Sequence, residues 1–268
     1  MKKLKNVWLN GFFRAWDMMF LFAWDEYCRN FIAVDRSNCR GVHVLCGMLG
    51  SAFIGGLFMV FFSWGLAVLL GGVPGAVISA AALMLLWLWS DHGAGVTAVS
   101  SMLAGKISGR KLSEILPSLE VRPEELTHGL AGAVMAVLII FKLAVFYVVI
   151  SSGNYYLLIL ILLSEAFTQA SVLNTHTGGG AFFGFERPQD AKIFYICAIV
   201  LLLAGSKFNL MVALAFLGVA VLWNLWVRER FIRLPAGKSD ESITLYGEIA
   251  ALSGCAVAFI YSAGVLNR

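Results

Sequence analysis

The sequence predicts an all-α integral membrane protein, a polytopic bundle of about seven transmembrane helices with an amphipathic interfacial helix at its N-terminus. Hydrophobic residues fill 60% of the 268 positions, charged residues fill only 13%, and the mean hydropathy is +0.82. Soluble domains carry about a quarter charged residues, so this chain lacks the polar surface of a soluble protein. Several apolar runs approach the roughly 20 residues that a helix needs to cross a bilayer. The five cysteines are odd in number and lack framework spacing, which argues against a disulfide scaffold.

Seven apolar segments account for the predicted spans. They lie at residues 43–70, 74–90, 129–151, 155–173, 191–205, 208–227 and 244–263. The fifth is short, so we expect it to be tilted, re-entrant or extended by its neighbours. The spans divide the chain into a cytoplasmic N-terminal amphipathic arm, residues 1–42, and a transmembrane domain, residues 43–268.

The distribution of basic residues orients these spans. Long polar segments at 1–42, 91–128, 174–190 and 228–243 alternate with minimal turns. The side with the long segments carries 17 of the 20 Lys and Arg residues, the other side carries only Lys207 and Arg268, and Lys142 lies within a span. Cytoplasmic loops of membrane proteins are enriched in Lys and Arg. We therefore expect a multi-pass protein of the bacterial cytoplasmic (inner) membrane, with its N-terminus in the cytoplasm and its C-terminus outside.

Two amphipathic stretches fall on the predicted cytoplasmic side. Residues 4–24 carry aromatic residues at mostly three- or four-residue spacing with Lys and Arg between them, which is typical of a helix lying along the inner leaflet. A first helix packed in the core is the alternative. Residues 99–116 carry Lys106, Arg110 and Lys111, which would face lipid headgroups or an anionic ligand, or form an ordinary solvated face.

Polar residues inside the spans are expensive to bury and need partners. Lys142 and Glu165 lie in spans three and four, which a tight turn joins, so we expect them to pair or to line one polar cavity. Gln169 lies one helical turn from Glu165 and would share that cavity. Glu248, at the inner end of span seven, is interpreted as a solvated end residue or a ligand contact.

The four histidines occur at the cytoplasmic ends of four different spans. They are His43, His92, His128 and His176. If these helices adjoin, the imidazoles would converge on one cytoplasmic cavity together with Asp91, Asp240 and Glu248. Such a ligand set suits zinc, iron or nickel more than magnesium. Such a site would weaken below about pH 6 as imidazole protonates. The alternative to a metal site is that these are ordinary histidines at the membrane boundary. A second possible ligand trio, Cys39, His43 and Cys46, matches no established zinc spacing.

Two glycine-containing loops complete the set of candidate ligand contacts. Gly178, Gly179 and Gly180 follow the fourth span, and such a run lets backbone amides approach a phosphate closely, although a flexible linker has the same composition. The sequence at 237–239 is Gly-Lys-Ser, but no earlier glycine stands where a phosphate-binding P-loop requires one, and Ile232 occupies that position.

The order of these features resembles the cobalamin synthase family, the adenosylcobinamide-GDP ribazoletransferases, from about Arg40 onward. The matching features are a glycine-rich first span, the segment Ser90-Asp91-His92-Gly93, a basic stretch at 110–116, Thr127-His128-Gly129, a span carrying Lys142, a glycine loop at 177–182, and Gly237-Lys238-Ser239-Asp240 before Glu248. The family's acidic motif has three spaced aspartates, and here those positions carry His92, Val96 and Val99, with only a shifted Asp91.

The resemblance implies a metal-dependent transferase that joins GDP-activated cobinamide to a ribazole or its phosphate, with Mg²⁺ held against the substrate's phosphates. Catalysis would then fall to Asp91, Asp240 and Glu248. The residues left for substrate binding are Lys106, Arg110, Lys111, Gly178, Gly179, Gly180 and Lys238.

A second function stays open because the acidic motif is largely lost. A catalytically degenerate relative would serve as a membrane anchor, an assembly subunit, or a metal- or corrinoid-binding subunit. A transporter or channel is a further possibility, because Lys142 and Glu165 lie within predicted spans. The expected partners are membrane lipid, a corrinoid nucleotide if the protein is active, and a membrane-protein partner or a second copy, but no nucleic acid.

Overall fold

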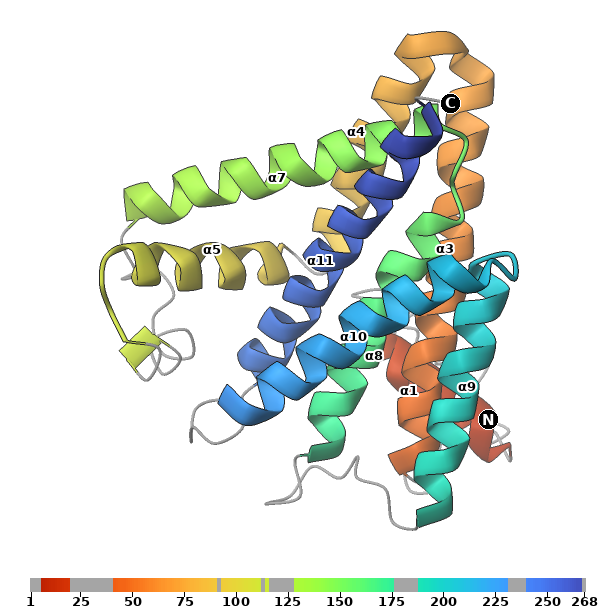
Figure 1. Ribbon diagram of the computed structural model, residues 1–268, viewed down its shortest axis with the longest axis vertical. Helices are drawn as coiled ribbons and strands as arrows, with labels where there is room; N and C mark the ends of the chain where they lie inside the picture. The colour runs from red at the N-terminus through yellow and green to blue at the C-terminus, as the bar shows by residue number, and fades with distance from the viewer. Residues whose placement is uncertain are drawn as a thin grey trace, which may run out of the picture.

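The computed structural model describes residues 6–19, 41–90, 93–111, 114–115, 128–175, 188–230 and 240–266. Over these residues the chain forms nine α-helices and no strand, which confirms the all-α prediction (Figure 1). The helices are α1 (Val7–Met19), α3 (Gly41–Leu70), α4 (Gly72–Ser90), α5 (Ala94–Ile107), α7 (His128–Ser151), α8 (Leu157–Thr175), α9 (Pro188–Gly205), α10 (Leu210–Arg230) and α11 (Asp240–Leu266).

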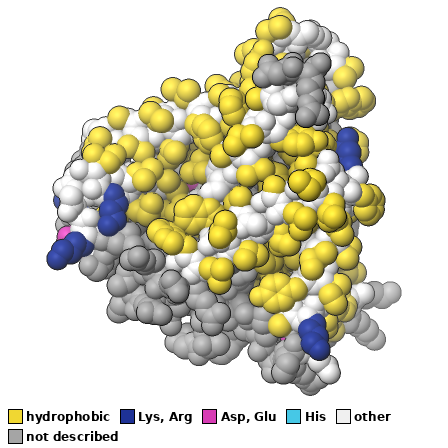
Figure 2. Space-filling model, viewed as in Figure 1, with side chains coloured by type: hydrophobic (Ala, Val, Ile, Leu, Met, Phe, Trp, Pro, Cys, Tyr) yellow, Lys and Arg dark blue, Asp and Glu magenta, His cyan; other side chains and the backbone are white. Residues whose placement is uncertain are grey.

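Among the residues that the structure describes, four helices are long and apolar enough to cross a membrane. Their apolar segments are Gly41–Leu70 in α3, Gly72–Trp89 in α4, Gly129–Ser151 in α7 and Ile243–Gly264 in α11. The surface is apolar as well: Leu69 is 82% exposed, Ile260 72% and Leu85 68%. Figure 2 shows hydrophobic side chains over most of one face, with Lys and Arg at its margins. An apolar exterior of this extent is suited to lipid, and the chain is a membrane protein.

Helix α8 occupies the centre of the bundle, although its apolar stretch, Leu157–Leu173, is shorter than those of the four long helices. It packs against α3, α9, α10 and α11. Every residue from Leu157 to Ser164 is buried. The run of leucine and isoleucine in this segment therefore fills the core from all sides of the helix, as expected for a helix that is hydrophobic all round.

Helix α3 approaches α8 most closely at Gly56. A Cβ atom at this position would lie 2.7 Å from the Cα atom of Ile159 in α8. No side chain fits at that separation, so glycine allows the two backbones to pack in contact, as small residues do between membrane helices.

Helix α1 packs along the N-terminal half of α3. A Cβ atom at Gly11 would lie 2.5 Å from the carbonyl oxygen of His43, and one at Gly47 would lie 2.6 Å from the carbonyl oxygen of Gly11. Asn10 and Ala15 are fully buried. One face of α1 is thus part of the core, the alternative that the sequence left open, while Trp8 remains 49% exposed and Leu9 45% exposed.

Helix α5 lies beside α7 and α11 and ends sooner than the amphipathic stretch at 99–116 predicts. Two backbone hydrogen bonds close its C-terminus: Gly109 N–H donates to the carbonyl of Lys106, and Arg110 N–H donates to that of Gly105. Gly109 has φ +80°. This is a Schellman motif, and the left-handed residue that it requires is most easily a glycine. The chain then turns back, and Ile115 packs over Gly105.

Candidate functional site

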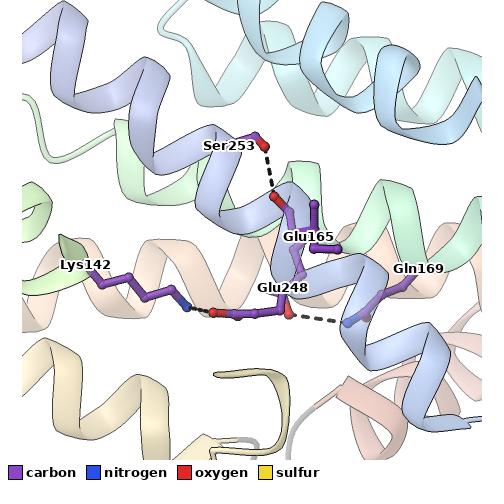
Figure 3. Close-up of polar contacts among 6 residues, drawn as sticks. Lys142, Glu165, Gln169, Glu248 and Ser253 are labelled. Carbon is purple, nitrogen blue, oxygen red and sulfur yellow. Dashed lines mark hydrogen bonds and ion pairs between the residues drawn. The ribbon is translucent and has the colours of Figure 1, made fainter. Parts of the chain in front are cut away.

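A buried ion pair joins α7 to α11. Lys142 Nζ lies 2.5 Å from Glu248 Oε1, and the two side chains are 0% and 1% exposed. Figure 3 shows the lysine reaching from one side toward the carboxylate of Glu248. Charges withdrawn from water in this way require partners, because the desolvation of each ion costs several kcal/mol. The pair is therefore a strong constraint on how α7 and α11 pack.

Helix α4 contributes an aromatic ring to the same site. The ammonium of Lys142 lies 4.3 Å from the centroid of the Trp87 ring, and Trp87 is 3% exposed. A cation over the face of an indole is attracted by the negative potential of the ring. Lys142 is thus held by a carboxylate from α11 and an aromatic face from α4.

Helix α8 adds a second carboxylate and an amide. Gln169 Nε2 donates a hydrogen bond of 3.3 Å to Glu165 Oε1, one helical turn away. Both side chains are half-buried. In Figure 3 Glu165 lies beside Glu248, and Gln169 approaches from the side opposite Lys142. The polar groups of α7, α8 and α11 therefore form one cluster.

Close packing of α11 on α8 brings this cluster together. A Cβ atom at Gly247 would overlap the side chain of Gln169, and one at Gly254 would lie 3.0 Å from Ser164 Oγ. The two glycines are one heptad apart and face α8. They let α11 approach close enough for Glu248, next to Gly247, to enter the cluster.

The partner of Lys142 differs from the expected one. The sequence predicts that Lys142 and Glu165 either pair or line one polar cavity, because a tight turn joins spans three and four. The ion pair is made with Glu248 of the last helix instead, while Glu165 lies in the same polar cluster. Glu248 was interpreted as a solvated end residue or a ligand contact, and the first of these is wrong because the side chain is buried. Glu248 is followed by small and apolar residues up to Gly254, and this pattern indicates that its side chain lies inside the bundle. The cluster joins α7, α8 and α11, and Glu248 is held in it by the ion pair with Lys142.

The basic residues near the end of α5 are accessible. Lys106, Arg110 and Lys111 are exposed, and the backbone N–H of Lys111 donates to Glu114 Oε2 over 3.3 Å. These side chains extend from the Schellman turn, where cations also compensate the negative end of the helix dipole. An anionic ligand or a headgroup layer can reach them.

The other predicted ligands are described only in part. His43 packs edge-on against the Trp8 ring, with the ring centroids 4.5 Å apart. The residues that lie outside the described part of the chain are Asp91, His92, His176, Gly178, Gly179, Gly180 and Lys238. His128 begins α7 and Asp240 begins α11, but their side chains are not described. In the described part of the chain, no three His, Cys, Asp or Glu side chains form a group able to hold a metal ion. The convergence of the four histidines stays a prediction.

Two of the three positions compared with the family's aspartates carry buried valines. Val96 is 0% and Val99 2% exposed. Val99 belongs to an apolar cluster between α5, α8 and α11. Its other buried members are Ala98, Ile115, Val172, Leu245, Tyr246 and Ile249. Mg²⁺ takes oxygen ligands and retains water, and these valine side chains provide neither.

Comparisons with protein-family models, with curated proteins and with solved structures find no match for this chain.

Proposed function

We propose that this protein is a non-catalytic membrane subunit, an anchor or assembly protein, built on the helical plan of the cobalamin synthase family. The observation that carries the proposal is the burial of Val96 and Val99, the second of them in an apolar cluster, at two of the positions where the family places magnesium-binding aspartates. A transferase of this kind needs charge stabilisation at the diphosphate. Apolar side chains in that place supply none.

The ion pair supports the same proposal in two ways. Lys142 and Glu248 are both features of the resemblance, and they come from distant parts of the chain to meet in the core. This supports a shared helical plan. Of the three candidate catalytic carboxylates, Glu248 is the one whose side chain the structure describes. It forms a buried ion pair with Lys142, so it has no access to a metal ion bound to a phosphate.

The proposal includes a topology of seven spans in a bacterial inner membrane, with the N-terminus in the cytoplasm. In Figure 1 the α3–α4 and α7–α8 connections and the C-terminal end of α11 lie toward the upper end, whereas the starts of α3, α9 and α11 lie lower. Alternating spans would produce this separation for α3, α4, α8, α9 and α11, whereas α7 runs across the view. The exposed basic end of α5 would then face the cytoplasm and be available to a partner.

Reporter fusions test this topology. A reporter that is active only in the cytoplasm should be active when fused at Ser118 and silent when fused at Asn154, and a periplasmic reporter should give the reverse pattern. The expectation rests on the 17 basic residues on one side against two on the other. The same compartment for both fusions would contradict the topology.

Complementation tests the function itself. The gene is expressed in a bacterial strain that lacks cobalamin synthase and is supplied with cobinamide and the base precursor. We expect no cobamide and an accumulation of GDP-activated cobinamide, while an authentic cobalamin synthase expressed to the same membrane level restores the product. Restored cobamide would instead identify a working transferase and leave Asp91 and Asp240 as its first candidates.

A further inference from the structure

We propose that a cavity beside the α3–α4 turn binds the ester end of one acyl chain of a membrane glycerolipid. The cavity has a volume of about 410 Å³ and is lined by residues of α3, α4, α7 and the α7–α8 connection. Pockets for small molecules have volumes in this range. The proposal is independent of the proposed function, since the cavity shares no residue with the Lys142 cluster or with α5.

The cavity exists because the α3–α4 hairpin contributes small residues to its wall. Ala67 of α3 and Gly72 and Ala76 of α4 line it, together with Tyr147 and Ile150 of α7. Helix α4 packs against both α3 and α7. Larger side chains at the three small positions would occupy the space, so the gap is a consequence of the sequence of the hairpin.

The cavity lies at the end of the apolar layer. The apolar segments of α3 and α7 end at Leu70 and Ser151, and that of α4 begins at Gly72. In Figure 1 the α3–α4 and α7–α8 connections both lie toward the upper end of the bundle. Tyrosine is enriched at this depth in membrane proteins because its ring is apolar and its hydroxyl is polar. The ester groups of glycerolipids lie at the same boundary, between the acyl chains and the headgroups.

The polar groups of the cavity suit an uncharged acceptor. Tyr147, Ser151 and Tyr155 line it with hydroxyl-bearing side chains, and none of the described residues in its wall is charged. The Ser151 hydroxyl donates to the carbonyl oxygen of Tyr147 over 2.8 Å. The half-buried Tyr147 and Tyr155 are therefore the donors for a bound molecule. An ester carbonyl accepts hydrogen bonds and has no net charge, whereas an anionic group would meet no cation in this wall.

The apolar part of the cavity suits an alkyl chain. Ala76 and Ile150 are buried in its wall, and Val68 and Val73 continue from it onto the exposed surface. Apolar cavities stay dry, and side chains beside an unfilled gap lose dispersion contacts. The two valines give an alkyl chain from the surrounding lipid an apolar path into the cavity, with the ester at the tyrosines.

Photolabelling in lipid nanodiscs tests the site in the full-length protein. The discs contain phosphatidylcholine and a trace of a diacyl phosphatidylcholine that carries a diazirine close to one ester. After irradiation and proteolysis, mass spectrometry should find adducts mainly in segments 67–76 and 147–155. The double variant Tyr147→Phe with Tyr155→Phe keeps the rings and should lower this labelling about fivefold, as expected for a lost hydrogen bond.

A filling variant and a second probe complete the test. Ala67→Phe places a ring at the cavity wall and should remove most of the labelling, whereas Ala136→Phe, at an exposed position of α7, should leave it unchanged. A probe with ether links in place of the esters should label the site about fivefold less. Adducts spread evenly over the exposed helices would overturn the proposal. Equal labelling by the ester and ether probes would overturn it as well.

Discussion

Replacing Glu248 with alanine should lower the free energy of unfolding in detergent by about 3–5 kcal/mol, the cost of leaving a buried ion without its partner. The reason is the burial of Lys142, which is 0% exposed and faces Glu248 and Trp87. The double replacement Lys142→Met with Glu248→Leu removes both charges and should lie within about 1 kcal/mol of the parent protein. Denaturant titration followed by tryptophan fluorescence measures all three proteins.

The control for this prediction is Glu165→Ala. Its side chain is half-buried and accepts a hydrogen bond from Gln169, so the expected loss is nearer about 1 kcal/mol. Equal losses for Glu248→Ala and Glu165→Ala would contradict the assignment of Glu248 as the ion-pair partner. Additive losses from Lys142 and Glu248 replacements would mean that the two charges act independently.

The second large effect is expected at the crossing of α3 and α8. Leucine in place of Gly56 would have to displace the backbone of Ile159 in the central helix, since even a Cβ atom would lie 2.7 Å from its Cα. Overpacking of this kind costs about 1–3 kcal/mol and occasionally more, and contact with backbone places Gly56→Leu at the upper end. We expect a loss of about 3 kcal/mol together with a lower yield of folded protein.

Gly65→Leu is the matched control on the same helix. A Cβ atom at Gly65 meets nothing within 4 Å, so the side chain would extend into open space. This variant should be as stable as the parent or slightly more so, because leucine favours a helix over glycine by up to about 1 kcal/mol. Similar melting temperatures for the two leucine variants would contradict the close crossing of α3 and α8.

The long helices are predictable from the sequence because each is an apolar run bounded by polar residues or glycine. The run at 43–70 corresponds to α3 (Gly41–Leu70), and that at 129–151 corresponds to α7 (His128–Ser151). The central place of α8 is harder to predict, since its leucine-rich sequence suits lipid and protein surroundings equally well. Its burial on all sides becomes evident only when the neighbouring helices are placed.

The sequence identifies the charged residues of the buried cluster, but it does not identify which carboxylate pairs with Lys142. Lys142 inside an apolar span requires an anionic partner, and the choice of Glu165 followed from proximity in the chain. The actual partner, Glu248, depends on how α11 crosses α8, which Gly247 and Gly254 determine by their contacts with Gln169 and Ser164. Glycine spacing within one helix does not identify the helix that it faces, so the pairing requires tertiary structure.

The most direct test of the proposed function is a transfer assay on the purified protein. The protein in detergent or lipid nanodiscs is given GDP-activated cobinamide, ribazole and Mg²⁺, and the release of GMP is measured beside an authentic cobalamin synthase. With Val96 and Val99 buried where the family carries aspartates, we expect no GMP above the protein-free blank. GMP released in equal amount with a cobamide, and lost in an Asp240→Asn variant, would contradict a non-catalytic role.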